Sequence, residues 1–281
     1  MSSTALSLRI FDNDVCIDTD RQTVDLLLEN FGFMRTNDQV QARLNYIVEP
    51  SSPAGSYTVS REGAESLIAR NNAELLFILE KDITIELQKI RGDLYFLHGA
   101  ALELGGNACM IVAPSGSGKS TTAWALLHNG FRYLSDELAP VNLETMEVTP
   151  YPHAVCLKSD PPEPYVLPDA TLRTISTLHV PVDALPVAPI SHSVPLAAVF
   201  FLQYTPEAAA SVADTITAAE AGARIYSNTL NLLAHPHGGI DAAIAIARHS
   251  RCFNIKSSNL TQTCALIKAV MEEFTEGNCP A

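Results

Sequence analysis

The sequence has little charge, few aromatic residues and no long apolar run. Charged residues make up 17% of its 281 residues and aromatic residues 7%. No stretch approaches the roughly 18 unbroken apolar residues of a membrane-spanning helix, and the N-terminal segment MSSTALSLRIFDNDVC has no basic run followed by an apolar core. We therefore expect neither a membrane span nor a secretory signal. Hydrophobic residues make up 47%, enough to form a core, which excludes wholesale disorder.

Basic residues are scarce relative to acidic ones. The chain has 18 Lys and Arg against 31 Asp and Glu, which gives a net charge of −13. Such a surface repels nucleic acid and anionic lipid, and no local basic patch offsets it. The composition predicts a soluble, compact, cytoplasmic protein without nucleic-acid or membrane partners.

Clusters of metal ligands are also lacking. The cysteines are scattered singly without a C-x-x-C pair, which excludes the usual zinc and disulfide frameworks: Cys16, Cys109, Cys156, Cys252, Cys264 and Cys279. Cys109 and Cys156 lie in apolar runs and are predicted to be small core residues. His235 and His237 form a close pair without further donors nearby, so we expect a Pro- and Gly-rich loop there rather than a metal site.

Residues 1–90 carry no chemical motif and are of mixed α and β character. Alternation and turn residues predict a hairpin over residues 5–20, and the composition of residues 50–56 predicts a loop. Apolar spacing predicts helices over residues 23–33, 64–70 and 83–90, while residues 73–79 fit a strand or a helix. We interpret residues 1–90 as a separate α+β domain for packing, docking or acceptor recognition.

Residues 91–281 alternate strands and helices and form the second predicted domain, with an α/β fold. Two apolar runs, residues 93–104 and 107–113, flank Gly105-Gly106-Asn107, a strong hairpin signal. Farther on, residues 195–204 are predicted to form a buried strand, and helices are predicted over residues 220–234, 238–250 and 261–274.

The second strand of that hairpin runs into a glycine-rich segment that begins a helix. Glycines allow consecutive backbone N–H groups to turn inward, and the helix adds the positive end of its dipole. A strand, P-S-G-S-G-K-S and a helix together predict a phosphate-binding loop. The consensus begins with Gly, whereas this sequence has Ala113, which fits if its φ stays negative. The residues predicted to bind the nucleotide are Ser115, Gly116, Ser117, Gly118, Lys119, Ser120 and Thr121.

An acidic pair follows the loop closely. Asp136 lies 17 residues after Lys119, on what we predict to be the next strand, beside the strand that feeds the loop. A carboxylate there can hold Mg²⁺, orient an attacking hydroxyl or accept its proton. Because alternate strand residues face opposite sides, we assign the chemistry to Asp136 and a secondary role to Glu137. The alternative is a pair of solvated acids at a strand end.

These segments resemble a known family. The order of HGAALEL, the hairpin, APSGSGKSTTAWALLHNGFRYLSDE and PYPHAVCLK is similar to the HPr kinase/phosphorylase superfamily, especially its HPr-kinase-related branch, in which S-D-E replaces A-D-D. The resemblance covers roughly residues 90–281 and is densest over residues 95–160. It implies a P-loop kinase domain with a fold like that of the ATP-dependent phosphoenolpyruvate carboxykinases.

The resemblance also implies residue roles. Lys119 matches the phosphate lysine, Ser120 the metal hydroxyl, Asp136 the catalytic aspartate and Glu137 its acidic neighbour. His98 matches a histidine close to the transferred phosphate, whereas from the sequence alone a core or hairpin histidine bonded to the backbone is favoured.

This sequence departs from the bacterial enzyme in two respects. It has no E-x-R-G-L-G signature, which the family ties to phosphorolysis and subunit assembly, and its first 90 residues do not resemble the bacterial N-terminal domain.

Lys158 matches a lysine that recurs in the branch and could contact the substrate or a phosphate. The alternative is that Lys158 is a lone surface lysine without such a role. Some relatives in the branch phosphorylate the C-terminal serine of ribosomal peptide precursors.

We therefore expect a kinase that uses ATP and Mg²⁺ to phosphorylate a hydroxyl, such as serine, of a peptide or small protein. A kinase for a small hydroxylated metabolite and a nucleotide-binding regulator without transfer activity are the alternatives. Intact Lys119, Ser120 and Asp136 argue against the regulator. The acceptor and homo-oligomer formation are left open by the sequence.

Overall fold

The computed structural model describes residues 4–37, 41–187 and 189–276, which form a mixed α/β chain with several sheets. These residues divide into two compact units. Unit 1 comprises Met1–Leu87, His153–Asp160 and Leu167–Ala184, and unit 2 comprises Gln88–Pro152, Pro161–Val166 and Leu185–Ala281. The predicted division after residue 90 differs from this, because residues 153–160 and 167–184 pack with the N-terminal segment.

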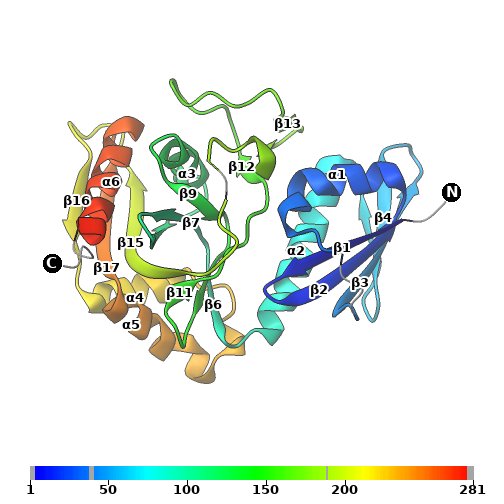
Figure 1. The fold of residues 1–281 in the computed structure, drawn as a ribbon, viewed down its shortest axis with the longest axis horizontal. Helices are drawn as coiled ribbons and strands as arrows, with labels where there is room; N and C mark the ends of the chain where they lie inside the picture. The colour runs from blue at the N-terminus through cyan, green and yellow to red at the C-terminus, as the bar shows by residue number, and fades with distance from the viewer. Residues whose placement is uncertain (1–3, 38–40, 188, 277–281) are drawn as a thin grey trace. The chain divides into compact units, whose positions relative to one another are not determined.

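Unit 1 contains a sheet with its strands in chain order, of which Figure 1 labels β1 to β4, and a smaller sheet in the order β12-β14-β13. The first sheet is formed by β1 (Thr4–Ile10), β2 (Asn13–Thr19), β3 (Leu44–Ser51), β4 (Ser56–Arg61) and β5 (Leu67–Ala69). The second is formed by β12 (Val155–Leu157), β13 (Leu172–Arg173) and β14 (Leu178–Val180). The helical elements are α1 (Arg21–Phe31), η1 (Gly32–Met34), α2 (Asn72–Ile90), whose last residues belong to unit 2, and η2 (Val182–Ala184).

Several N-terminal predictions are confirmed. The hairpin over residues 5–20 is β1–β2, turning at Phe11 and Asp12 with φ of 49° and 58°. The helices expected over residues 23–33 and 83–90 are α1 and α2, and α2 also takes up residues 73–79. The loop expected over residues 50–56 is shorter than predicted: residues 52–55 form the turn that joins β3 to β4, and residues 50, 51 and 56 belong to these strands.

The helix predicted over residues 64–70 is wrong. Leu67, Ile68 and Ala69 instead form β5, which pairs antiparallel with β4. A helix of seven residues is too short to be stable by itself, whereas pairing along an existing strand satisfies the backbone groups of this segment at once.

Unit 2 is built on a sheet whose main path runs β6-β10-β11-β15-β8-β7-β9, with β17 pairing β15 and β16 pairing β17. Its strands are β6 (Leu94–Leu97), β7 (Gly99–Leu104), β8 (Asn107–Val112), β9 (Arg132–Ser135), β10 (Ala139–Asn142), β11 (Glu147–Val148), β15 (Val194–Tyr204), β16 (Val212–Thr215) and β17 (Arg251–Ser257). Its helical elements are α3 (Lys119–Leu127), α4 (Ala218–Ser227), η3 (Leu232–Ala234), η4 (Pro236–Gly239), α5 (Ile240–His249) and α6 (Leu260–Glu276).

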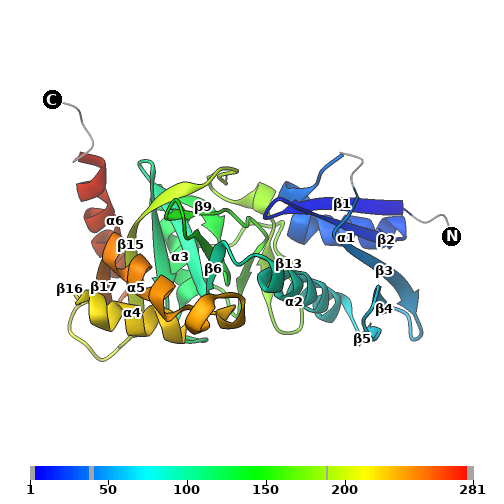
Figure 2. The same ribbon diagram turned by 90° about the horizontal axis from the view of Figure 1, so that it is seen from below.

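Helices cover both faces of this sheet, as Figure 1 shows, and the view from below in Figure 2 brings α4 and α5 to the front. Alternation along β8 explains the arrangement, since Ala108, Met110 and Val112 belong to the core cluster that includes buried residues of α4 and α5. The intervening Cys109 and Ile111 are also fully buried, and α3 and α6 contact β8. A central strand covered on both faces has a continuous apolar sequence, and β8 fits that rule.

Three further predictions need correction or refinement. The apolar run 93–104 is two strands, β6 and β7, with a break at His98. The helix expected over residues 220–234 ends at Ser227, where the chain turns into a bridge between Leu97 and Thr229. The strand that carries Ser135 does not lie beside β8, because β7 returns between them and pairs with both.

Candidate functional site

The segment between β8 and α3, which the sequence predicts to be a phosphate-binding loop, turns at two glycines. Gly116 and Gly118 have φ of 84° and 85°, in the left-handed region that residues with a Cβ rarely adopt. A Cβ at either position would meet nothing within 4 Å, so the requirement for glycine is conformational rather than steric. Gly118 caps the N-terminus of α3, and its carbonyl accepts a hydrogen bond from Thr122 N at 2.8 Å.

Ala113 fits at the position where the loop consensus has glycine. It is not among the described non-glycine residues with positive φ, which are Phe11, Asp12, Glu137, Met146 and His237. The backbone there therefore places no demand that alanine cannot meet.

Lys119 begins α3 and folds back over the loop. The residue is only 4% exposed, and its Nζ donates to the Ala113 carbonyl at 3.0 Å. This contact holds the ammonium where the strand ends and the helix begins, the position at which a phosphate group would meet the helix N-terminus. Ser117, Ser120 and Thr121 are half-buried, and Ser115 is exposed.

Asp136 and Glu137 form a tight turn at the end of β9. Glu137 has φ of 62°, and Leu138 N donates to the Asp136 carbonyl at 2.7 Å. A hydrogen bond across a single residue with positive φ has the pattern of a γ-turn, which is rare and strained in proteins. The Asp136 carboxylate stabilises the turn by accepting from Glu137 N at 3.0 Å, and the residue is fully buried.

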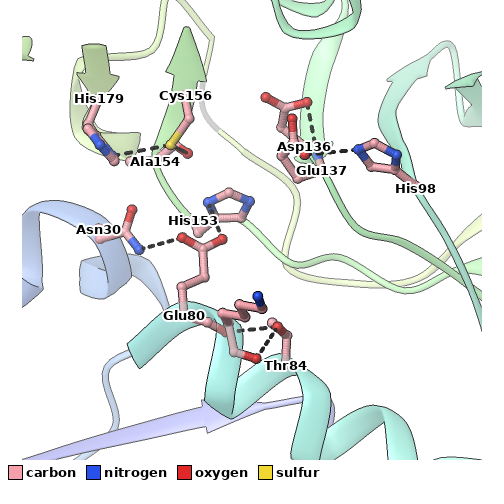
Figure 3. Close-up of polar contacts among 11 residues, drawn as sticks. Asn30, Glu80, Thr84, His98, Asp136, Glu137, His153, Ala154, Cys156 and His179 are labelled. Atoms are coloured by element: carbon pink, nitrogen blue, oxygen red, sulfur yellow. Dashed lines mark hydrogen bonds and ion pairs between the residues drawn. The ribbon is translucent and has the colours of Figure 1, made fainter. Parts of the chain in front are cut away.

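His98 lies at a second break in the sheet and contacts the same turn. Its backbone N donates to the Asn228 carbonyl at 2.9 Å. Its Nε2 lies 3.0 Å from Oε2 of Glu137, whose side chain is half exposed (Figure 3). The chain passes from β6 to β7 at His98 and from β9 to β10 at residues 136–138. These two breaks correspond to each other, because β6 pairs with β10 and β7 pairs with β9.

Strand register places these groups at the same edge of the sheet as the loop. Gly99, which follows His98, pairs with Val112, the last residue of β8. On the other side of β7, Ala101 pairs with Ser135, the last residue of β9. The loop, His98 and Asp136 therefore all follow or precede strand ends at one edge, although β7 lies between β8 and β9. Lys158 is exposed and belongs to unit 1 rather than to the unit that carries the loop.

The donor set fits a magnesium ion bound together with phosphates. In the described residues, no group of three or more His, Cys, Asp and Glu side chains forms a metal cluster. Magnesium does not need such a cluster, since it is usually held by one or two protein oxygens, waters and the phosphates of its substrate. The Ser120 hydroxyl at the start of α3 and the Asp136 carboxylate at the same sheet edge are oxygen donors of this kind.

The histidine pair near residue 236 forms a turn. His237 and Gly238 have positive φ, and His237 Nδ1 lies 3.3 Å from Asp241 Oδ2. The His235 ring packs against Tyr95, with ring centroids 5.0 Å apart.

Two cysteines behave differently from each other. Cys109 is fully buried, as predicted, and burial raises the pKa of its thiol to about 12. Cys156 was expected in the core but is only partly buried, and its Sγ lies 3.2 Å from His179 Nδ1. The sequence has no local motif that predicts this contact, because the two residues are brought together by strand pairing. Cys279 lies outside the described residues.

Comparisons with known proteins add little to these observations. No family model matches the sequence, and no curated protein matches it. A solved structure, that of the HPr(Ser) kinase/phosphatase from Coxiella burnetii, is similar over 66% of this chain and 99% of that chain, with 11% identity and a TM-score of 0.33. At that level the similarity carries no argument about fold or activity, so both rest on the residues of this chain. None of the helices in residues 4–37, 41–187 and 189–276 combines the length and apolarity needed to cross a bilayer.

Proposed function

We propose that this chain is a kinase that uses ATP and Mg²⁺ to phosphorylate a hydroxyl, such as serine, of a peptide or small protein. The observation that carries the proposal is the loop between β8 and α3. In this loop, two glycines with a left-handed backbone conformation precede Lys119, whose side chain folds over the loop. Asp136 lies at the same sheet edge and supplies the carboxylate that phosphoryl transfer needs near the loop.

The loop and Lys119 would bind the phosphates. Backbone N–H groups near the N-terminus of α3 donate to phosphate oxygens, and the helix dipole favours negative charge there. The ammonium of Lys119 neutralises charge on the β- and γ-phosphates. Ser120 and Asp136 would hold Mg²⁺, which when bound neutralises charge that develops on the phosphate oxygens.

Asp136 would also act on the acceptor. Its carboxylate can orient the attacking hydroxyl and accept the proton that the hydroxyl loses. The γ-turn fixes the direction of this side chain, since Oδ1 is held by Glu137 N. The contact between Glu137 and His98 joins the two chain breaks that flank this position, so we assign both residues to positioning the turn.

Acceptor recognition is assigned to unit 1. The glycine-rich loop and the turn at Asp136 both belong to unit 2, whereas residues 1–90 carry no such motif, and acceptor choice is the function still to be assigned. We therefore propose that residues 1–90 contribute to acceptor binding and do not contact the nucleotide phosphates.

Transfer of label from γ-labelled ATP tests this function. The full chain is incubated with Mg·ATP and either serine-containing peptides or small hydroxylated metabolites, with Asp136→Asn as the control. Labelled peptide that depends on Asp136 supports the proposal, whereas labelled metabolite alone identifies a metabolite kinase. Binding of Mg·ATP without transfer to any acceptor would contradict the kinase and favour the nucleotide-binding regulator.

A further inference from the structure

Neighbouring segments bond the outer side of edge strands in the sheet of unit 2. At β6, Leu230 N donates to the Phe96 carbonyl at 2.9 Å, and at β9, Ile190 N donates to the Tyr133 carbonyl at 3.0 Å. These contacts satisfy backbone groups that an edge strand otherwise presents to any extended chain.

The first sheet of unit 1 has one edge closed in the same way and one edge open. At β1, Leu8 forms a bridge with Arg35, and Thr36 N donates to the Ser7 carbonyl at 2.9 Å. The other edge is β5, which Figure 2 labels beside β4, its pairing partner. In the part of the chain that the structure describes, no strand or bridge pairs with the outer side of β5. Unpaired N–H and C=O groups of a strand are complementary to the backbone of another extended peptide.

The side chains of β5 do not protect this edge. Edge strands commonly carry a charge, a proline or a bulge that prevents pairing with another chain. β5 consists of Leu67, Ile68 and Ala69, pairs with β4 in continuous register, and leaves Leu67 44% and Ile68 67% exposed. By contrast β16, an edge strand of unit 2, carries the exposed Asp214. Of these two strands, only β5 combines exposed apolar side chains with the lack of a charge.

β5 is held in place on both sides of its open edge. Ser66 Oγ lies 2.8 Å from Ser60 Oγ just before the strand, and Arg70 N donates to Glu74 Oε2 at 2.7 Å just after it. Ala69 is fully buried. A peptide that pairs with such a preformed strand does not have to order it first, which lowers the entropic cost of binding.

Charges near the edge favour a basic peptide. Glu62 and Glu65 are both exposed and lie in the connection between β4 and β5. The neighbouring base, Arg61, is paired with Asp82, with Nε 2.7 Å from Oδ2. Arg70 follows β5 at the end away from this connection. A peptide along β5 therefore meets negative charge at one end of the strand, which a basic side chain complements.

We propose that β5 binds the acceptor peptide as an added strand, with an apolar residue against Ile68 and a basic residue beside Glu62 and Glu65. This inference rests on the proposed kinase, since it takes the acceptor to be a peptide. Main-chain hydrogen bonds to β5 supply affinity for an extended segment, and the side chains at alternate positions determine which segment is preferred.

Fluorescence anisotropy without nucleotide tests this site separately from phosphoryl transfer. The probe is a fluorescein-labelled synthetic peptide of alternating isoleucine and threonine that ends in two lysines and a serine. A second peptide has glutamate in place of both lysines. Two further peptides have the sequence of the probe and carry backbone N-methyl groups, one at its odd and the other at its even positions.

We expect the full chain to bind the lysine peptide about tenfold more tightly than the glutamate peptide. One N-methylated peptide should lose at least about tenfold in affinity while the other binds like the probe, because a strand bonds its neighbour on one side through alternate residues only. Equal affinities of the two N-methylated peptides, or no binding of the probe, would overturn the proposal.

Variants of exposed isoleucines locate the binding strand. Ile68→Thr keeps a residue suited to a strand but loses apolar contact, and should weaken binding of the lysine peptide about 5- to 10-fold. Ile47→Thr is the matched control, because Ile47 is 52% exposed but lies on β3, an interior strand. It should bind like the unmodified chain. Equal effects of the two substitutions would overturn the assignment to β5.

Charge reversal tests the preference for a basic peptide. Glu65→Lys should remove the difference between the lysine and glutamate peptides, whereas Glu29→Lys, on the exposed side of α1, should retain it. Equal effects of these two variants would overturn the assigned role of the acidic connection.

Two further measurements separate this inference from its alternatives. Light scattering that shows a dimer of the unmodified chain and a monomer of Ile68→Thr would assign the edge to a second copy and overturn the proposal. Transfer of label from ATP to the bound probe supports both the site and the kinase. Binding that follows the N-methylation pattern, with no transfer to any peptide, would contradict the kinase and retain β5 as a peptide-binding edge.

Discussion

Asp136 and Glu137 are neighbours in the sequence, yet their carboxylates have different surroundings. Asp136 is fully buried, whereas the side chain of Glu137 is 50% exposed and contacts His98. The positive φ of Glu137 turns the chain between the two residues, so strand alternation alone does not describe their directions. If the chain is the kinase proposed above, this difference would separate a reacting carboxylate from a positioning one.

Replacing Asp136 with Asn should separate these roles. Asparagine keeps the size and one acceptor oxygen, so nucleotide affinity should stay within about tenfold while kcat falls by about 10² to 10⁴, the range for lost general-base assistance. Single-turnover transfer, with thermal melts to verify folding, measures the effect.

Glu137→Gln is the matched control for that substitution and should slow transfer less. If Glu137→Gln is the more damaging change, the assignment of the two carboxylates is inverted. If neither variant slows transfer, the acidic pair is not catalytic.

The backbone at residue 137 can be tested separately from its charge. Both Glu137→Ala and Glu137→Gly remove the contact with His98, but only glycine adopts a φ of 62° without strain. We expect the glycine variant to be more stable than the alanine variant by about 1 kcal/mol, the usual cost of left-handed backbone for a residue with a Cβ. Urea denaturation of the two variants measures the difference, and a more stable alanine variant would show that the turn is not strained.

At the scale of elements, the loop between β8 and α3 depends on its glycines. Gly118→Ala should lower the free energy of unfolding by about 1–2 kcal/mol, since φ is 85° there. It should also weaken Mg·ATP binding, because relieving the strain turns the N–H groups at the start of α3. Chemical denaturation and calorimetry measure the two effects.

Gly32→Ala is the control for that substitution. Gly32 has φ of −53° and open space where a Cβ would lie, so alanine should leave stability unchanged or raise it by about 0.4–1 kcal/mol. Equal effects at Gly32 and Gly118 would show that the loop conformation is not what glycine provides at position 118.

The elements with strong local signals are those that the sequence predicts. The β7–β8 hairpin turns at Gly105 and Gly106, both with positive φ, and α3 begins directly after the glycine loop. Prediction fails where pairing over distance decides. Residues 64–70 have helical spacing, yet Leu67–Ala69 pair with β4 as strand β5. Likewise, β9 does not pair with β8, because β7 forms the hairpin with β8 and occupies the position between them.

At the scale of the whole molecule, the chain leaves unit 1 and later returns to it. Residues 153–160 and 167–184 are far in sequence from residues 1–87 but cluster with them. Ala154 N donates to the Asn30 carbonyl at 3.1 Å, and the buried His153 lies 3.3 Å from the Glu80 carboxylate. No local pattern predicts such contacts, nor the pairing that sets Cys156 against His179.

Removing residues 1–87 should therefore affect two parts of the remaining chain differently. Amides of β12 and β14 should lose protection from hydrogen exchange, because these strands keep their pairing with each other but lose the N-terminal segment that clusters with them. Amides of β8 and β15 should stay protected, since their pairing and helical cover belong to unit 2. Exchange followed by mass spectrometry, with the full chain as reference, measures both regions, and unchanged protection of β12 and β14 would contradict the division into units.

The central claim is that the loop at Gly116–Lys119 binds Mg·ATP, and calorimetric titration of the full chain tests it most directly. We predict saturable binding by the unmodified protein and an affinity about 10- to 100-fold lower for Lys119→Ala, the loss expected when a charged hydrogen bond to phosphate is removed. Thermal melts verify that both proteins are folded. Absence of binding by the folded, unmodified chain, or equal affinities for the two proteins, would contradict the assignment of this loop to the nucleotide.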